Sequence, residues 1–128
     1  CVGTLVLFKE GTAEIDDVGK QRLGRFANEV RGKPYKIEIR GHASRNPSHD
    51  AWQISYARCR AAQKFLEDRG IESDRIRLSQ GGPHEPYSIR VDPAKQAFNS
   101  RIEVYMLNEF AEDSMGTPEE RASRFITP

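Results

Sequence analysis

The feature that most constrains the fold is a strand pattern, a long helix pattern and a second strand pattern in direct succession. Residues 35–41, YKIEIRG, alternate between apolar and polar side chains, so Ile37 and Ile39 share one face of a strand. Residues 50–70 then carry apolar side chains at helical spacing, and residues 75–79, RIRLS, alternate again. This succession predicts a right-handed crossover unit, in which the helix packs on the sheet that contains both strands.

Three more segments extend this unit. A short apolar run at residues 5–8 predicts a strand covered on both faces, and helical spacing from Asp16 or Asp17 to about Val30 predicts a first helix. Residues 100–107, SRIEVYML, predict the last strand. The order strand, helix, strand, helix, strand, strand predicts an α/β two-layer sandwich with the helices on one face of a mixed sheet.

The pattern also predicts which side chains face the core and which face water. Charged residues on one face of the strands predict that this face is open to solvent. The second helix should pack through an apolar stripe, with Trp52 as a core anchor in its first turn. The predicted core residues are Leu23, Phe26, Ala27 and Val30 on the first helix, Ile54, Ala57, Ala61 and Phe65 on the second, and Ile102, Val104 and Met106 on the last strand; the predicted solvent-facing residues are Lys36, Glu38, Arg75, Arg77 and Glu103.

Length and composition indicate one globular domain. The chain has 128 residues, of which 37% are hydrophobic and 30% charged, which is ordinary for a folded protein and too apolar for disorder. We assign residues 1–110 to the domain and residues 111–128 to a C-terminal tail. Within the tail, Thr117 and Pro118 predict the start of a short helix.

Charge and hydropathy exclude two classes of partner. The net charge is +1, with acidic and basic residues interspersed, so the chain lacks the basic surface that nucleic acid requires. No apolar run approaches the roughly 18 residues of a membrane span. Nucleic-acid binding and membrane insertion by this chain are therefore not expected.

The residues that carry chemistry elsewhere do not form a catalytic or metal-binding pattern here. The two cysteines, Cys1 and Cys59, have no disulfide or metal spacing, and Cys59 falls in a helix pattern as a small buried residue. Residues 48–50, Ser-His-Asp, are adjacent, whereas a catalytic triad is assembled in space rather than along the chain. The histidines have no metal-ligand spacing with acids or cysteines. We expect no enzyme activity, no metal and no cofactor.

A long polar loop lies between the second strand and the second helix, in RGHASRNPSHDAWQISYARCR at residues 40–60. Four stretches of the chain resemble the OmpA-like peptidoglycan-binding domain, and most closely its flagellar-motor stator branch, MotB. The family pattern of G-H-T-D, S-N-W-E-L-S-x-x-R-A, a glycine-rich turn ending in proline, and N-R-R-V-E is matched by GHAS, DAWQISYARC, QGGPHEP and NSRIEV. The resemblance runs from about Leu5 to Asn108 and implies the OmpA C-terminal-like fold.

The resemblance implies a non-catalytic clamp for the diaminopimelate residue of peptidoglycan stem peptides. In the family, a loop carboxylate takes the ligand ammonium, a helix arginine takes its carboxylate, and loop backbone groups add hydrogen bonds. A zwitterion suits one acid and one planar, bidentate cation at a fixed separation. By position, Arg58 falls on the ligand arginine, and His42, Asn99 and Arg101 match family motif residues. The site residues that the resemblance implies are Arg58, Ser44, Asp50, His42, Ala43, Arg101 and Asn99.

Several positions depart from the family pattern or leave two roles open. Ser44 stands where the family has the ligand-binding aspartate, and loss of that charge weakens a contact to an ammonium. Asp50 can cap the second helix with Gln53, or it can face the ligand in place of the missing acid. Arg58 can bind the ligand or pair with a neighbouring acid, and Arg101 can contact the ligand or brace the long connection before the last strand.

Two functions therefore remain open. The first is non-catalytic binding of peptidoglycan, with the domain anchoring a membrane or motor complex to the cell wall. The second is a degenerate OmpA-like domain that serves as a structural or protein-interaction module without peptidoglycan binding. The resemblance also implies a homodimer in the periplasm or cell envelope, tethered to a membrane by an N-terminal segment outside this sequence.

Overall fold

The described part of the chain folds in the predicted order of elements. A computed structural model describes residues 2–42, 52–81 and 100–111. Within these ranges the order is strand, helix, strand, helix, strand, strand, and a short 3-10 helix that the sequence did not predict precedes β3. The elements are β1 (Gly3–Leu7), α1 (Asp17–Val30), β2 (Tyr35–His42), α2 (Trp52–Asp68), the 3-10 helix η1 (Ser73–Arg75), β3 (Ile76–Gly81) and β4 (Arg101–Phe110).

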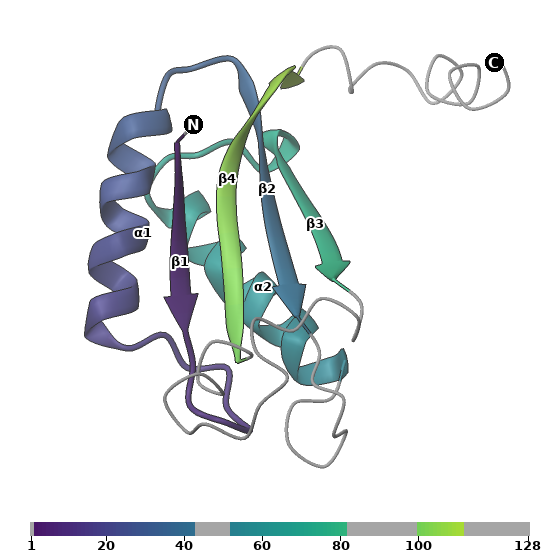
Figure 1. Ribbon diagram of the computed structural model, residues 1–128. Helices are drawn as coiled ribbons and strands as arrows, with labels where there is room; N and C mark the ends of the chain where they lie inside the picture. The colour runs from purple at the N-terminus through teal and green to yellow at the C-terminus, as the bar shows by residue number, and fades with distance from the viewer. Residues whose placement is uncertain (1, 43–51, 82–99, 112–128) are drawn as a thin grey trace, which may run out of the picture.

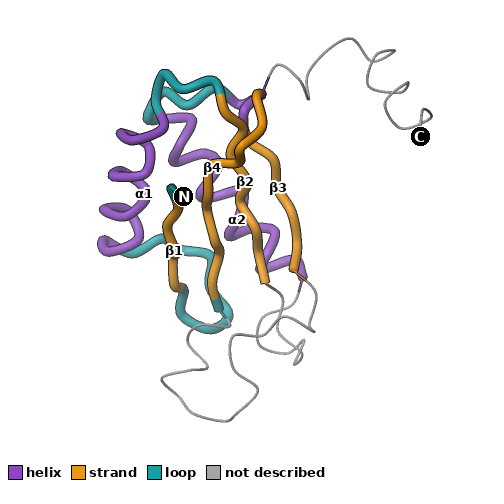
Figure 2. The backbone as a smooth tube through the Cα atoms, turned by 45° about the horizontal axis from the view of Figure 1, so that its top comes forward, coloured by secondary structure: helices purple, strands orange, loops and turns teal. Residues whose placement is uncertain are grey.

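The strands form one mixed sheet with the helices on one face. The strand order is β1-β4-β2-β3, in which β2 and β3 are parallel and β4 runs antiparallel to both β1 and β2. Helices α1 and α2 lie on the same side of the sheet, and no helix of the described residues lies on the other side (Figures 1 and 2). The predicted two-layer α/β sandwich is therefore confirmed. No helix in the described ranges is long and apolar enough to cross a membrane.

Helix α1 packs as the sequence predicts. Asp16 caps its first turn, because the carboxylate accepts a hydrogen bond of 2.8 Å from the backbone N–H of Gly19. Its four predicted core residues are all buried, and so are Ile102 and Val104 of β4. The buried side chains of both helices and the inner sheet face form one continuous core.

Helix α2 packs through a different face from the predicted one. Ser55, Cys59, Ala62 and Leu66 are buried, whereas Ala57 is exposed. Small side chains of α2 face the sheet because the helix approaches β2 closely at Gly41, a residue without a side chain. The prediction that Ile54, Ala61 and Phe65 form the centre of the buried face is therefore wrong. These side chains lie beside the contact with the sheet and are only partly buried. The prediction for Trp52 is wrong as well, because its side chain is 57% exposed.

The face of the sheet without helices is covered in part by its own polar side chains. Arg77 donates two hydrogen bonds, of 2.8 and 2.6 Å, to Oε1 of Glu38, and Tyr105 donates to the second carboxylate oxygen. Burial alone would raise the pKa of Glu38, but the hydrogen bonds from Tyr105 and Arg77 outweigh it and hold the pKa below its usual value. Glu38 and Arg75 are buried, so their predicted exposure is wrong.

The first strand is buried on one face only. Val6 and the following Phe8 belong to the core, while Leu5 and Leu7 are partly exposed on the face without helices. Alternation along the strand puts successive side chains on opposite faces, and only one face meets the helices. The prediction that both faces are covered is therefore wrong.

Candidate ligand-binding site

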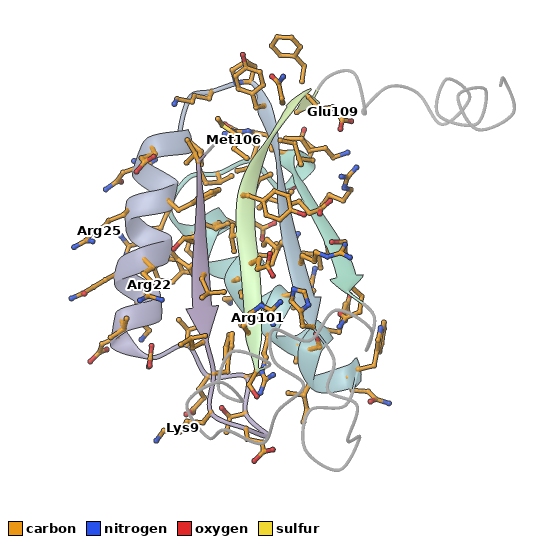
Figure 3. All side chains as sticks on the ribbon, in the orientation of Figure 1. Lys9, Arg22, Arg25, Arg101, Met106 and Glu109 are labelled. Atoms are coloured by element: carbon orange, nitrogen blue, oxygen red, sulfur yellow. The ribbon has the colours of Figure 1, made fainter. Side chains whose placement is uncertain are left out.

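The described site residues lie at one end of the sheet, where β1 and β2 end and β4 begins. The backbone N–H of Phe8, just after β1, donates a 2.8 Å hydrogen bond to the carbonyl of Ser100, just before β4. Lys9 and Arg101 both lie at this lower end of the sheet (Figure 3). His42 is the last residue of β2 and lies beside the start of β4, since its neighbour Gly41 pairs with Ile102.

Arg58 reaches this end of the sheet from the helix side. It lies in the second turn of α2, and its side chain is fully buried, with 0% exposure. Its Nε donates a 2.7 Å hydrogen bond to the carbonyl of Thr12, and its Nη2 donates a 3.1 Å bond to the carbonyl of Lys9. The guanidinium carbon also lies 5.0 Å from the ring centroid of Phe8. Arg58 thus joins α2 to the segment between β1 and α1.

His42 and Arg101 lie on the opposite face of the sheet, around a shared acid. A Cβ atom added to Gly41 would point at α2. Successive side chains of a strand point to opposite faces, so the side chain of His42 points away from the helices. The Nε2 atom of His42 lies 2.8 Å from Oε1 of Glu103, and the Nε of Arg101 donates a 3.1 Å hydrogen bond to the same oxygen. Glu103 therefore orients both predicted site residues at this end of the sheet.

The environment of His42 favours the neutral imidazole. Burial lowers the pKa of His42, the positive charge of Arg101 lowers it further, and Glu103 only partly opposes the shift. The site consequently has two arginines and one carboxylate at neutral pH among these described residues, Arg58, Arg101 and Glu103. Arg58 lies on the helix side of the sheet, whereas Arg101 and Glu103 lie on the other side, so these three charges do not form one continuous binding surface.

We predict that the lowered pKa of His42 makes the fold less stable in mild acid. The unfolded chain takes up a proton on this imidazole near the usual histidine pKa of about 6.5, whereas the folded chain resists protonation. Stability is therefore greatest above that pH and falls as the pH drops through it. Urea denaturation midpoints measured on both sides of this pH should show the fall in the wild type and a smaller fall in His42→Gln. An equal pH dependence in the two proteins would contradict the assignment.

The structure places three of the seven predicted site residues. His42 and Arg101 come together through Glu103, and Arg58 reaches the same end of the sheet from the other face. The predictions for Ala43, Ser44, Asp50 and Asn99 lie outside the described residues. No group of three or more histidine, cysteine or acidic side chains in the described ranges could hold a metal ion.

Sequence reasoning missed two parts of this arrangement. Glu103 had a usable signal, because it lies two residues after Arg101 on an alternating strand and must share its face. The carbonyls of Lys9 and Thr12 had none, because main-chain acceptors carry no residue-type signal.

The family model of the OmpA family matches residues 7–100, well over half of the chain. The chain belongs to the OmpA family. The matched residues cover most of the range from about Leu5 to Asn108, so the predicted resemblance is confirmed over most of its length. OmpA-family domains are non-catalytic modules, so the prediction that the chain is not an enzyme is confirmed.

Several relatives share the fold across most of the chain. Motility protein B of Escherichia coli strain K12 is 26% identical over 125 residues, which cover 85% of this chain and 37% of that protein. The C-terminal domain of Helicobacter pylori MotB has a TM-score of 0.71 at 17% identity and covers 98% of both chains. The peptidoglycan-associated lipoprotein of Burkholderia pseudomallei has a TM-score of 0.72 at 19% identity and covers 80% of this chain and 89% of that one. At these identities, the two solved structures establish likeness of fold alone. The chain spans little more than a third of the curated relative's length.

Proposed function

We propose that this OmpA-family domain binds peptidoglycan through the diaminopimelate-type zwitterion of a stem peptide and anchors a membrane or motor complex to the cell wall. Support comes from the family match and from relatives named motility protein B and peptidoglycan-associated lipoprotein. The single observation that carries the proposal is the position of Arg58. This residue matches the family's ligand arginine, and its guanidinium is held by the carbonyls of Thr12 and Lys9 at the end of the sheet where β1 ends.

The contacts of Arg58 suit it to hold a carboxylate in one orientation. Two of its nitrogens donate to the carbonyls of Thr12 and Lys9, so the planar group cannot rotate freely. A fixed guanidinium loses little rotamer entropy when it binds an anion. Because the side chain has no exposed surface here, the proposal requires local opening at this end of the sheet when ligand arrives.

Arg101 supports this site by bracing it. It is buried on the face away from α2, and its Nε donates to Glu103. We propose that Arg101 holds Glu103 in place instead of contacting the ligand, and its bracing of the long connection before β4 stays a prediction. In the proposed site, Arg101, Glu103 and His42 hold the end of β2 where the predicted ligand loop begins.

One observation favours the second function, a structural or protein-interaction module. The burial of Arg58 and its two main-chain acceptors would be sufficient reason for an arginine at this position without any ligand. Under this reading, Arg58 stabilises the fold alone, and removal of its charge should have no separate effect on peptidoglycan binding.

A titration with a diaminopimelate-containing muropeptide tests the proposed function. We predict weak binding by the wild type, because Ser44 supplies no charge for the ligand ammonium. Ser44→Asp should tighten binding by about ten- to hundredfold, the usual gain when a neutral hydrogen bond becomes charge-assisted. Calorimetry or amide chemical shifts can measure the change.

Ser44→Asn is the matched control, since asparagine has the shape of aspartate without its charge. Its affinity should stay near that of the wild type. No detectable binding by either the wild type or Ser44→Asp would favour the structural module instead. We further propose that the domain works in the periplasm as a homodimer, within a longer protein that a membrane segment tethers.

A further inference from the structure

Two large aromatic side chains are exposed near the start of α2. Trp52 is 57% exposed and Tyr56 38% exposed, and they lie one helical turn apart. Their rings stack with centroids 5.5 Å apart and an angle of 19° between the ring planes. A contiguous exposed aromatic pair is uncommon on a folded domain and indicates a contact surface.

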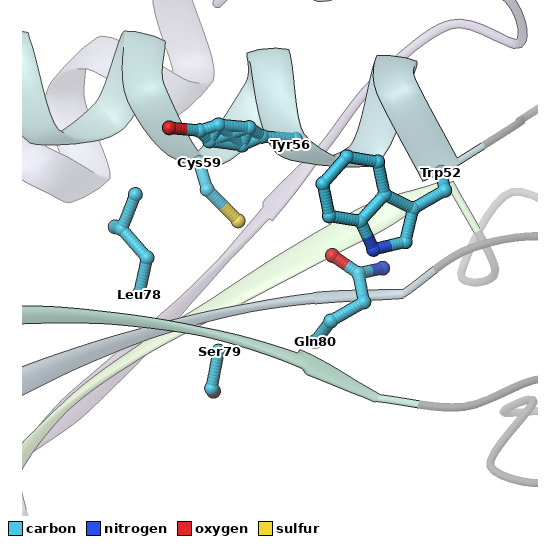
Figure 4. Close-up of a pocket in the computed structure, with 6 residues that line it drawn as sticks. All are labelled: Trp52, Tyr56, Cys59, Leu78, Ser79 and Gln80. Carbon is cyan, nitrogen blue, oxygen red and sulfur yellow. The ribbon is translucent and has the colours of Figure 1, made fainter.

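The aromatic pair borders a pocket between α2 and β3. The pocket has a volume of about 230 Å³, close to the size of one large side chain. Leu78 and Gln80 point from β3 toward α2, while Ser79 points to the other face of the sheet (Figure 4). Ser79 therefore lines the pocket with its backbone. The pocket is lined by Trp52, Tyr56, Cys59, Leu78, Ser79 and Gln80.

Strand β3 lies at the edge of the sheet. It pairs with β2 on one side, and within the described residues no strand pairs with its other side. An edge strand presents a row of backbone donors and acceptors that can pair with an added strand. The opposite edge is different, because Arg22 donates a 3.0 Å hydrogen bond to the carbonyl of Leu5 in β1.

The pocket and its surroundings select an uncharged occupant. None of the six lining side chains is acidic or basic, and burial raises the pKa of the Cys59 thiol to about 12. Farther along α2, Arg60 donates to Gln63, which in turn donates to Glu67, so the flanking charges offset each other. A charged side chain entering the pocket would lose its hydration without gaining an opposite charge.

We propose that β3 and this pocket form a docking groove for an extended, uncharged peptide segment of a partner protein. The segment adds a strand to the edge of β3 that no described strand occupies, and it places one bulky apolar side chain between Trp52, Tyr56 and Leu78. Main-chain pairing supplies affinity in this mode of recognition, and the side-chain pocket supplies specificity. The inference goes beyond peptidoglycan binding and uses none of the residues assigned to the zwitterion.

Selection from a phage-displayed library of short random peptides tests this proposal. The full wild-type chain is the target, and peptides that also bind the Trp52→Ala variant are removed. The expected peptides have no net charge and carry one aromatic or large aliphatic residue within a β-forming stretch. A synthetic copy of an enriched peptide should shift the β3 amide resonances and bind Trp52→Ala about tenfold more weakly or worse.

Two controls distinguish strand addition from nonspecific binding of peptides to exposed aromatic residues. Phe110→Ala removes another exposed aromatic side chain, 43% exposed at the far end of β4, and should leave peptide affinity unchanged. N-methylation of alternate peptide amides should abolish binding in one register and spare it in the other, because only every second amide faces β3. Trp52 is exposed, so its variant should keep the wild-type denaturation midpoint, which is measured alongside.

Three results would overturn the proposal. The first is a selection in which no peptide distinguishes the wild type from Trp52→Ala. The second is peptide binding that survives N-methylation in both registers, which would exclude main-chain pairing. The third is a shift of the same amides by a chitin trisaccharide and by none of the peptides, which would assign the aromatic pair to a sugar.

Discussion

Arg58→Ala is expected to lower the free energy of unfolding by about 3 kcal/mol and to abolish binding of the muropeptide. The loss of stability follows from burial. The side chain has no exposed surface, and its removal leaves the carbonyls of Lys9 and Thr12 without these donors. Each hydrogen bond from a charged donor contributes about 1.5–3 kcal/mol. Urea denaturation measures the first effect, and titration at a temperature where the variant is folded measures the second.

Two matched variants separate the fold from the site. Arg60→Ala removes an exposed arginine of the same helix that donates to Gln63, so stability should change by less than about 0.5 kcal/mol. Arg58→Lys keeps the charge without the planar fork and should bind more weakly than the wild type while losing less stability than alanine. A folded Arg58→Ala variant that binds muropeptide with unchanged affinity would remove Arg58 from the site.

Gly41→Ala is expected to destabilise the domain by about 2 kcal/mol, because the contact between α2 and β2 has no room for a methyl group. A Cβ atom at Gly41 would lie 2.4 Å from Oγ of Ser55, 2.9 Å from Sγ of Cys59 and 2.9 Å from Oε1 of Gln80. Ser55 and Cys59 are buried on α2, and the Ser55 hydroxyl accepts a 2.6 Å hydrogen bond from Nε2 of Gln80, so making room for a methyl group would disturb this packing. Urea denaturation again provides the measurement.

Gly24→Ala serves as the control for a glycine in open surroundings. Its Cβ would meet only Nη1 of Arg69, at 3.8 Å, and alanine favours the helix by up to about 1 kcal/mol. In the double variant Gly41→Ala, Ser55→Ala, part of the lost stability should return, since the nearest obstructing atom is gone and alanine is a good helix former. Equal stability of Gly41→Ala and the wild type would show that α2 and β2 are less closely packed than described.

Much of the fold could be predicted because two patterns were unambiguous. Alternation placed Ile37 and Ile39 in the core, and helical spacing placed Leu23 and Phe26 there. Helix α2 was harder, because Leu66 is buried while Ile54 and Phe65 are only partly buried and Trp52 is exposed. Ser55 and Cys59 face the sheet because β2 has a glycine, Gly41, opposite them, and this constraint depends on tertiary packing. Hydrophobicity alone therefore assigned the wrong face.

Family position selected candidate site residues, but it could not predict their contacts. Family position selected Arg58, His42 and Arg101, all of which lie at one end of the sheet. The partners of Arg58 are main-chain carbonyls from a loop 46 and 49 residues away, which only the folded chain brings near. Exposure of Trp52 could not be foreseen either, because an aromatic residue in a first helical turn is equally compatible with a core.

The direction of β1 has a mechanical consequence for the proposed anchoring of a complex to the cell wall. The start of β1 and the candidate site lie at opposite ends of the sheet (Figure 1). A tensile load between these two points runs along the strand axis, while the bonds from β1 to β4 lie across it. All of those hydrogen bonds then share the load in shear instead of separating one after another. The hydrogen bonds from Arg58 to the carbonyls of Lys9 and Thr12 hold the segment after β1 at the loaded end.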